Sequence, residues 1–358
     1  MSLKKIVLTG GGTAGHVTSN IAIIPELKSR GWEIHYIGTK TGIEKNLISE
    51  IPDVSYYSIQ SGRLRRYFDI KNLTDPFRVI AGVGQSASLI RKIKPQIIFS
   101  KGGFVTVPVV LGGWLNRIPV IVHESDITPG LANKIATRFA KTVCTTFPET
   151  LAYFAQGKAV HTGSPIRREL FLGSSERGKV FCGFTDDKPV IMVMGGSLGA
   201  VAINNAIRSL LPKLTRRFQI VHICGKGNFD GQLDNYPGYK QLEYVKEELP
   251  DIMSLADIMV TRAGANSIFE FLALKKPALL IPLPLSASRG DQILNAQSFK
   301  QQGFSMVLDQ ENMTEDSLYD HIVELYHNRQ KYIDAMEKSD TGNGIDKVLE
   351  LIEAQSLK

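Results

Sequence analysis

Three glycine-rich turns, each placed where a buried strand should give way to a helix, constrain this chain more than any other feature. They are Gly10–His16, Gly102-Gly103 and Gly195–Ala200, and each follows a short apolar run. Glycine lets backbone N–H groups approach an anion closely, and the helix that follows adds its positive end. A glycine needed only for tight packing is the alternative at any single turn. Because one such turn opens each half of the chain, the pattern predicts two nucleotide-type domains that share a phosphate-bearing ligand.

The order of strand, turn and helix repeats through both halves. Strands are expected near 6–8, 33–37, 96–99, 120–123 and 142–145, and again near 190–194, 218–223, 258–261 and 278–282. Short β-branched runs that alternate with helical patterns predict parallel sheets with right-handed crossovers. A turn-rich stretch at 162–165 separates the halves. We therefore expect an α/β chain with domains over 1–162 and 163–340. A last helix lies within 341–358, and the sequence leaves open whether it packs on the N-terminal or the C-terminal domain.

The composition is that of an ordinary globular enzyme. Hydrophobic residues make up 43% and charged residues 22% of the 358 residues, which are typical values. The longest apolar stretch, 104–122, is interrupted by prolines, glycines and an arginine, so no membrane-spanning helix is expected. No signal-peptide pattern opens the sequence. The three cysteines lie far apart in apolar contexts, which indicates reduced core thiols in the cytoplasm and neither a disulfide nor a metal site.

Basic charge is concentrated in the first half. Residues 1–160 contain 20 Lys and Arg against 10 Asp and Glu, a net charge of +10, while the whole chain carries +7. Three arginines within 63–66 precede Tyr67-Phe68 and an apolar stripe over 73–83. One interpretation is a peripheral membrane patch that binds an anionic lipid surface. A solvated loop followed by an ordinary amphipathic helix is the other. Nucleic acid is not an expected partner, because the basic residues lack interleaved aromatics and any known binding module.

Six motifs in a fixed order resemble one family. They are Gly11–His16, Lys101–Val105, His123–Asp126, Gly163–Arg167, Gly195–Ala200 and Arg262–Glu270. This set resembles the MurG family, the N-acetylglucosaminyltransferases that convert lipid I to lipid II in peptidoglycan synthesis. The resemblance covers nearly the whole chain, from residue 6 to about 340.

The resemblance implies a GT-B fold, in which two Rossmann-like domains with parallel sheets face an inter-domain cleft. It places the acceptor on the N-terminal side and UDP-N-acetylglucosamine (UDP-GlcNAc) on the C-terminal side. The implied reaction is an inverting transfer to the 4-hydroxyl of the muramyl sugar of lipid I. The implied location is the cytoplasmic face of the cell membrane, as a peripheral protein. No cofactor and no metal are required.

The donor side has a set of expected contacts. The third turn, with the Ser197 hydroxyl as an added donor, suits the diphosphate of the leaving UDP. Glu270, about one turn into a helix, can accept hydrogen bonds from both ribose hydroxyls, although a capping or surface role is the alternative. The resemblance assigns Arg167 to the nucleotide edge and the backbone of Val245 to uracil.

Polar residues after a buried strand, Asp291, Gln292 and Asn295, suit hydrogen bonds to sugar hydroxyls. The family often has two glutamines where this chain has Asp291 and Gln292. The full set assigned to UDP-GlcNAc is Thr13, Gly15, Arg167, Ser197, Val245, Glu270, Asp291 and Gln292. The glycines assigned to phosphate turns are Gly11, Gly12, Gly102, Gly103, Gly195, Gly196 and Gly199.

Two residues are candidates for the catalytic base. His16 closes the first turn, and the ordinary histidine pKa near 6.5 suits removal of a proton from a sugar hydroxyl. Anion binding or helix capping from the same place is the alternative for His16. Asp126 stands where family members commonly carry asparagine, and a carboxylate there would be the base itself or would tune His16. His123 and Glu124 are expected to orient the acceptor or a partner.

Other functions are distinguishable. A GT-B enzyme with another lipid or small-molecule acceptor would share the donor motifs and differ at 61–68 and Asp126. A UDP-GlcNAc 2-epimerase needs a different set of acid and base carboxylates. An NAD-dependent dehydrogenase is disfavoured because the first turn lacks a clean Gly-x-Gly-x-x-Gly. A non-catalytic nucleotide-sugar-binding paralogue stays open, and a transfer assay would separate it.

Overall fold

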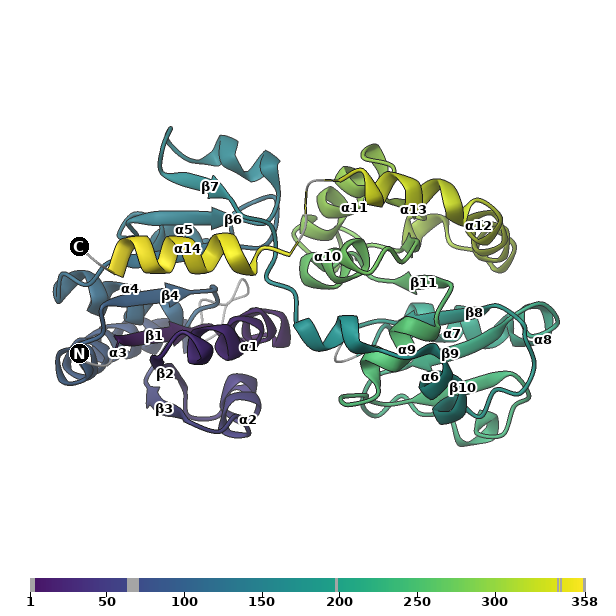
Figure 1. Cartoon of the computed structure of the whole chain (residues 1–358), viewed down its shortest axis with the longest axis horizontal. Coiled ribbons are helices and arrows are strands. Elements are labelled where there is room, and N and C mark those ends of the chain that lie inside the picture. Colours follow the sequence, from purple (N-terminus) through teal and green to yellow (C-terminus); the bar gives the residue numbers. More distant parts are fainter. Residues whose placement is uncertain (1–3, 63–70, 197–198, 340, 342, 357–358) are drawn as a thin grey trace. The chain divides into compact units, whose positions relative to one another are not determined.

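The computed structural model describes residues 4–62, 71–196, 199–339, 341 and 343–356, with the backbone alone at 71–74. The chain divides into two compact units (Figure 1). The first comprises Met1–Arg167 together with Asn343–Lys358, and the second comprises Arg168–Gly342. The limits expected from the sequence, at 162 and 340, stay predictions for a functional division into domains.

The first unit is built on a seven-stranded sheet of order β3-β2-β1-β4-β5-β6-β7, in which every pair of neighbours is parallel. Its strands are β1 (Lys4–Thr9), β2 (Trp32–Thr39), β3 (Val54–Ile59), β4 (Ile97–Ser100), β5 (Val120–Glu124), β6 (Thr142–Thr145) and β7 (Ala159–His161). Its helices are α1 (Ala14–Ser29), α2 (Ile43–Ser49), α3 (Lys71–Ile93), α4 (Thr106–Leu115), α5 (Leu131–Ala136), the 3₁₀ helix η1 (Pro148–Tyr153) and α14 (Ile345–Ser356).

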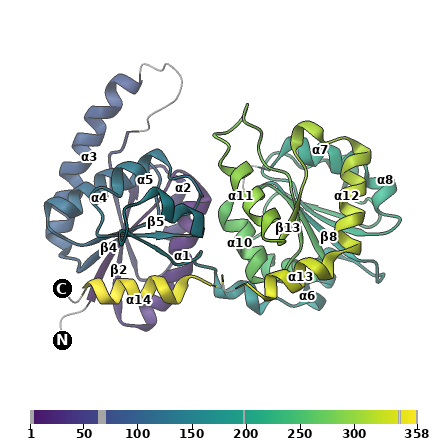
Figure 2. The same cartoon turned by 90° about the horizontal axis from the view of Figure 1, so that it is seen from above.

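Both faces of this sheet are covered, as parallel sheets require. Ile6 and Leu8 of β1 belong to one apolar layer, which also contains buried residues of α1, α2 and α14. Val7, between them, belongs to a second layer formed with α3, α4 and α5. Figure 2 shows α14 on one side of the sheet and α3 with α4 on the other. Successive side chains of β1 therefore pack into two different apolar layers, one on each face of the sheet.

The last helix returns to the first unit. In α14, Ile345, Val348 and Ile352 are fully or almost fully buried in the layer that contains α1. The segment before α14 is hydrogen-bonded to the end of the stretch Met1–Arg167. The backbone N–H of Ile166 donates to Asn343 Oδ1 at 2.9 Å, and Asn343 Nδ2 donates to the Ile166 carbonyl at 3.0 Å. The C-terminal helix thus completes the core of the first unit.

The second unit contains a six-stranded parallel sheet of order β10-β9-β8-β11-β12-β13. Its strands are β8 (Val190–Met194), β9 (Gln219–Ile223), β10 (Tyr239–Leu242), β11 (Ile258–Thr261), β12 (Ala278–Leu280) and β13 (Ser305–Val307). Its helices are α6 (Ser175–Cys182), α7 (Val201–Ser209), α8 (Leu211–Leu214), α9 (Leu249–Leu255), α10 (Ala265–Ala273), α11 (Asp291–Gln301), α12 (Glu315–His327) and α13 (Arg329–Glu337). Three 3₁₀ helices complete it, η2 (Arg168–Leu172), η3 (Gly231–Leu233) and η4 (Gln310–Asn312).

The predicted fold class is confirmed, since each unit is a parallel sheet wound with helices. In each sheet the strand order reverses direction once, at β1 in the first unit and at β8 in the second. Ligands of such sheets bind at the carboxyl ends of the strands beside this switch point. No described helix meets the length and apolarity needed to cross a membrane.

Candidate functional site

The switch point of the second unit lies between β8 and β11. The turn after β8 contains Gly196 and Gly199, which have positive φ angles of 90° and 76°, a conformation that favours glycine. A Cβ on Gly199 would collide with the carbonyl oxygen of Cys224, so no larger residue fits there. Helix α7 starts directly afterwards, and its N-cap residue Ala200 supplies no side-chain hydrogen bond. Ser197, the predicted hydroxyl donor, lies outside the described residues.

A pocket of about 370 Å³ opens beside this turn. Its lining residues are Gly195, Gly199, Ala200, Val201, Ala202, Arg262, Leu283, Pro284, Ala287, Gln292 and Gln310. The lining therefore combines the predicted phosphate turn with Gln292, one of the three residues expected at the sugar. It also contains Arg262 and Gln310, for which no individual role was predicted.

The residues expected at the sugar differ in the hydrogen bonds that they already make within the protein. Gln292 Oε1 accepts a hydrogen bond from the backbone N–H of Leu283 at 3.1 Å, so the amide NH₂ group is the donor that it can offer a ligand. Asp291 accepts from Arg289 Nε at 2.8 Å. Asn295 is fully buried, and its Nδ2 donates to the Ala263 carbonyl at 3.2 Å. Asn295 thus supports the β11–α10 turn, and its expected contact with sugar stays a prediction.

The residues expected at the nucleoside come from three separate parts of the chain. Glu270 lies within α10 and is partly exposed. Val245 follows β10 and is only 9% exposed, so its backbone and not its side chain would have to read a base. Neither residue lines the pocket described above. Arg167 is partly exposed and is the last residue of the first stretch of the first unit. Their roles at UDP stay predictions.

The switch point of the first unit brings two glycine turns together. The backbone N–H of Gly11 donates to the Gly102 carbonyl at 3.2 Å. Gly102 and Gly103 have φ angles of 105° and 92°, and a Cβ on Gly103 would collide with the Gly11 carbonyl oxygen. Behind the first turn, a Cβ on Gly11 would meet the Glu44 carboxyl group, whose carbon would be 2.8 Å away. At Gly11, tight packing therefore already accounts for the glycine.

His16 is held by the turn that it closes. Its Nδ1 lies 2.9 Å from the Gly11 carbonyl oxygen and 3.2 Å from Thr13 Oγ1. A carbonyl only accepts, so Nδ1 carries the proton and donates to it. In the neutral ring the lone pair is then on Nε2. The ring is partly exposed, and the expected role of His16 as a base stays a prediction.

Asp126 lies near a buried polar cluster that contains Lys101 and His123. Lys101 is fully buried, and its Nζ donates to His123 Nδ1 at 2.7 Å. His123 Nε2 in turn donates to the Gly163 carbonyl at 3.1 Å. Burial lowers the pKa of Lys101 to about 7, although Glu124 and Asp126 oppose that shift. Burial and the Lys101 charge lower the pKa of His123 well below its usual value. His123 is therefore a neutral buried residue, and its expected part in orienting the acceptor stays a prediction.

Glu124 organises the loop that carries Asp126. Glu124 Oε1 accepts from the backbone N–H groups of Ser125 at 2.8 Å and Asp126 at 3.1 Å. Its Oε2 accepts from Gly130 N at 3.1 Å and Asn133 Nδ2 at 2.8 Å. Burial raises the pKa of Glu124, and the Asp126 charge adds to that shift. Glu124 thus fixes the backbone of this loop, while Asp126 is partly exposed and its role as a base stays a prediction.

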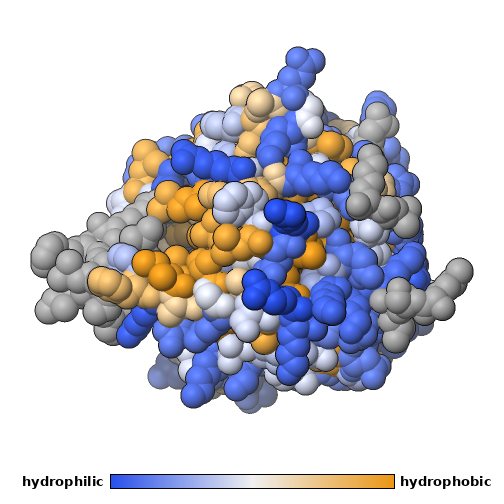
Figure 3. Space-filling view, turned by 90° about the vertical axis from the view of Figure 1, so that its left-hand side faces the viewer, coloured by the Kyte–Doolittle hydropathy of each residue, from blue (hydrophilic) through white to orange (hydrophobic). Residues whose placement is uncertain are grey.

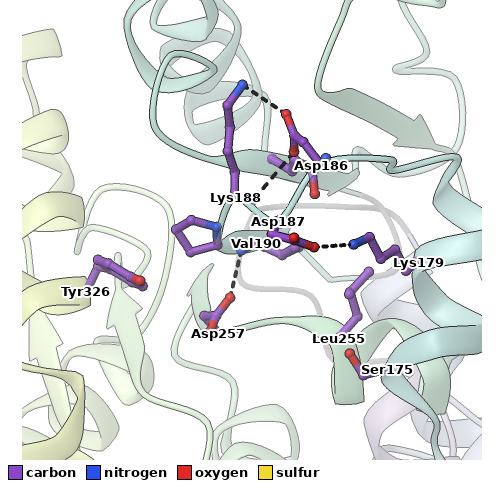
Figure 4. A pocket seen from close by; sticks show the side chains of 11 residues that line it. Ser175, Lys179, Asp186, Asp187, Lys188, Val190, Leu255, Asp257 and Tyr326 are labelled. Atoms are coloured by element: carbon purple, nitrogen blue, oxygen red, sulfur yellow. Dashed lines mark hydrogen bonds and ion pairs between the residues drawn. The ribbon is translucent and has the colours of Figure 1, made fainter.

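A second pocket of the second unit, of about 300 Å³, lies at the opposite, amino end of its sheet (Figure 4). Its charged groups are already paired. Lys179 contacts Asp187 at 2.7 Å, and Lys188 contacts Asp186 at 3.1 Å. Asp257 accepts from the backbone N–H of Val190 at 2.8 Å. Because these charges are satisfied within the unit, we assign the candidate site to the carboxyl end of the sheet.

The chain matches two family models and several proteins along nearly its whole length. Residues 6–145 match the glycosyltransferase family 28 N-terminal domain, and residues 190–352 match the glycosyltransferase family 28 C-terminal domain. A UDP-N-acetylglucosamine–N-acetylmuramyl-(pentapeptide) pyrophosphoryl-undecaprenol N-acetylglucosamine transferase of Clostridium tetani is 57% identical, over 98% of each chain. The protein of the same name from Lachnospira eligens is 58% identical, over 99% of this chain and 100% of its own length.

Solved structures agree. MurG of Acinetobacter baumannii has a TM-score of 0.77 at 26% identity, with 98% of this chain and 99% of that chain covered. A UDP-GlcNAc 2-epimerase from Neisseria meningitidis, with a TM-score of 0.69 at 13% identity over 98% and 100% of the two chains, shares the fold alone. Since both family models and the near-full-length relatives match, the chain belongs to glycosyltransferase family 28 and, within it, to the MurG family.

Proposed function

We propose that this protein transfers N-acetylglucosamine from UDP-GlcNAc to the 4-hydroxyl of the muramyl sugar of lipid I, which forms lipid II in peptidoglycan synthesis. The observation that carries the proposal is 57% and 58% identity over nearly the full length to two proteins named for such a transfer. The glycine turns at the switch points of both sheets support it, because this is where α/β sheets bind nucleotide and sugar ligands.

In this proposal the second unit holds the donor. The turn at 195–199 and the start of α7 bind the diphosphate, with Ser197 as a further donor. The carboxylate of Glu270 accepts from the ribose hydroxyls, and the backbone of Val245 reads uracil. The amide NH₂ of Gln292 donates to a sugar hydroxyl, since its oxygen is already used by Leu283. Asp291 completes the donor contacts of this unit, and Arg167, which belongs to the first unit, is assigned to the nucleotide edge.

The first unit holds the acceptor and the base. The acceptor oxygen attacks the anomeric carbon in line with the departing UDP, which inverts the α-linked donor to a β product. His16 Nε2 takes the acceptor proton, because the Gly11 carbonyl holds Nδ1 protonated at 2.9 Å. Asp126 is the alternative base. General base catalysis contributes about 10²–10⁴-fold, so the two assignments are separable by mutation.

The decisive experiment supplies UDP-GlcNAc and a soluble lipid I analogue. We expect UDP and a β-linked disaccharide to form in equal amounts, and neither to form without acceptor. UDP released without disaccharide would indicate hydrolysis or another acceptor. No turnover, with UDP-GlcNAc still bound in calorimetry, would point to a non-catalytic sugar-nucleotide-binding protein and would refute the proposal.

We further propose that the protein acts as a peripheral protein at the cytoplasmic face of the cell membrane. On the face of the first unit in Figure 3, apolar side chains gather in an area bordered by hydrophilic ones. Helices α3 and α4, which pack together, expose Phe77 and Ile80 at 75% and 68% and Trp114 and Leu115 at 54% and 56%. Helix α3 also carries exposed basic residues, including Arg91. The arginines within 63–66 lie outside the described residues.

Sedimentation with vesicles tests this surface. Apolar groups that enter the interface next to basic groups should favour anionic over neutral lipid. The double variant Phe77→Ser, Ile80→Ser should lose most vesicle binding and keep transfer to a soluble acceptor. Leu172 and Val180, which are 74% and 82% exposed on the second unit, provide the matched control. Equal loss in Leu172→Ser, Val180→Ser would contradict the assignment.

A further inference from the structure

The β5–α5 loop (residues 125–130) follows one carboxyl group and carries another. Glu124, the last residue of β5, is only 4% exposed, and Asp126 is partly exposed. Burial raises the pKa of Glu124, and the Asp126 charge raises it further. Like charges repel strongly where little water screens them. A cation nearby would therefore widen the pH range over which both carboxyl groups are ionised.

The hydrogen bonds of Glu124 do not supply this cation. Its four donors are the backbone N–H groups of Ser125, Asp126 and Gly130 and the side-chain amide of Asn133. All four are electrically neutral, so they orient the carboxylate without balancing its charge. Each carboxylate oxygen accepts two of these hydrogen bonds, and a proton on either oxygen would take the place of one donor. The hydrogen bonding of the loop therefore favours the ionised form of Glu124.

Lys101 is the buried basic residue beside this pair. It follows β4, the neighbour of β5 in the sheet, and its side chain is fully buried. The next residue, Gly102, packs against the amide that donates to Glu124, since a Cβ on Gly102 would lie 3.1 Å from Asn133 Nδ2. The Lys101 ammonium is attracted by Glu124 and, more weakly, by Asp126. Its charge therefore acts on both carboxyl groups at once.

The other titratable groups that face Lys101 are neutral. His123 Nδ1 accepts from Lys101 Nζ at 2.7 Å while its Nε2 donates to the Gly163 carbonyl, so the ring carries a single proton. In β6, burial raises the pKa of the Cys144 thiol to about 12, which keeps the thiol protonated. Within the described chain, the negative charges that attract the Lys101 ammonium are thus those of the two carboxylates.

We propose that Lys101 is a positioning residue of the β5–α5 loop: as the pH falls through neutrality its buried amine takes up a proton, and the ammonium keeps Glu124 and Asp126 ionised together. The only covalent change is one proton, which Nζ takes from solvent. Burial lowers the pKa of Lys101 to about 7, so the ammonium forms just where acid would begin to act on the cluster. That this loop serves the acceptor rests on the proposed function, whereas the ionisation of the cluster does not.

Carbon NMR titration of the side-chain carboxyl groups in the parent and in Lys101→Met tests the proposal. Methionine fills much of the same space without the charge. The pH at which the Glu124–Asp126 pair takes up its first proton should rise by about 1–3 units, the range for loss of an opposite charge. Lys134→Met, at an exposed lysine of α5, is the matched control and should leave this pH unchanged. An unchanged titration in Lys101→Met, or an equal shift in the control, would overturn the proposal.

The reciprocal measurement needs no change at Lys101 and covers the case in which its variant does not fold. Coupling between two ionisable groups is mutual. Because the Asp126 carboxylate stabilises the ammonium, Asp126→Asn should lower the pKa of Lys101 below its value of about 7, which nitrogen NMR of Nζ reports. Asp53→Asn, at an exposed aspartate of the same unit, should leave that pKa at its parent value. No difference between these two variants would contradict the proposal.

Transfer assays across the pH range separate this proposal from the proposed function. The ratio of Lys101→Met turnover to parent turnover should be constant above about pH 8, one unit above the pKa of Lys101, where the parent side chain is largely uncharged. Below pH 7 the ratio should fall, because only the parent then has the ammonium. A ratio that does not change with pH would leave Lys101 a structural residue. Both NMR shifts without any transfer by the parent would refute the proposed function and keep the charge balance of the loop.

Discussion

Replacement of Lys101 by methionine should stabilise the first unit, and the gain should depend on pH in a defined direction. Lys101 is fully buried, and burial lowers the pKa of its ammonium from 10.5 to about 7. Between these values the unfolded chain binds a proton that the folded chain does not. The contribution of Lys101 to stability must therefore rise with pH across this window and be lowest below pH 7.

The magnitude follows from the size of the shift. A pKa lowered from 10.5 to about 7 corresponds to a cost of about 5 kcal/mol for the buried ammonium at low pH. Methionine has no such cost, but it leaves His123 Nδ1 without its donor, which costs about 1–3 kcal/mol at every pH. At pH 6 we expect Lys101→Met to be more stable than the parent by roughly 2–4 kcal/mol. At pH 10 the order should be reversed or equal.

Urea unfolding from pH 6 to 10 provides the measurement. The two tryptophans of the chain, Trp32 and Trp114, both lie in the first unit, so their fluorescence reports that unit. The difference in unfolding free energy between the variant and the parent should change by up to about 1.4 kcal/mol per pH unit. Lys134→Met, at an exposed lysine of α5, should show no such slope. A difference in unfolding free energy that stays constant with pH would refute the reasoning, because it would mean that folding does not lower the pKa of Lys101.

Three further predictions concern the sites. His16→Ala should lower turnover about 10²–10⁴-fold at unchanged UDP affinity; if it stays near the parent rate and Asp126→Asn collapses, Asp126 is the base. Glu270→Ala should weaken UDP binding by about 1–3 kcal/mol in calorimetry, and unchanged affinity would remove Glu270 from the ribose site. Gly103→Ala should destabilise the first unit in urea, because its Cβ collides with a carbonyl oxygen, whereas Gly84→Ala, with open space around it, should be neutral or stabilising.

The sequence predicted the centre of each sheet better than its edges. The predicted strands correspond to β1, β2, β4, β5 and β6 and to β8, β9, β11 and β12. The four strands that were not predicted, β3, β7, β10 and β13, are the four edge strands. A central strand of a parallel sheet is buried on both faces and reads as a continuous apolar run. An edge strand such as β10, Tyr-Lys-Gln-Leu, is buried only at alternate residues, so its sequence carries a weaker signal.

Prediction of the site from the sequence was also incomplete. Motifs that are contiguous in the chain, such as the turns at 10–16 and 195–200, were visible from residue types and spacing. Contacts between distant segments were not. Arg262 and Gln310 are separated by 48 positions and meet only because β11 and η4 are brought together. Lys101 and His123 are 22 positions apart, and nothing in the sequence indicates that the lysine is fully buried. The electrostatics of a site depends on such pairs, which sequence patterns do not contain.

Charge behind the turns distinguishes two sheets that share one topology. In the first unit the Glu44 carboxyl group packs behind Gly11, with Oε1 accepting from the backbone N–H of Thr39 at 3.0 Å. In the second unit the pocket at the equivalent edge has Arg262 in its wall and no acidic residue among its described lining. A carboxyl group close to a turn opposes the binding of a phosphate there. An uncompensated guanidinium does the opposite. Glycine turns that look alike in the sequence therefore differ in the charged side chains that lie next to them.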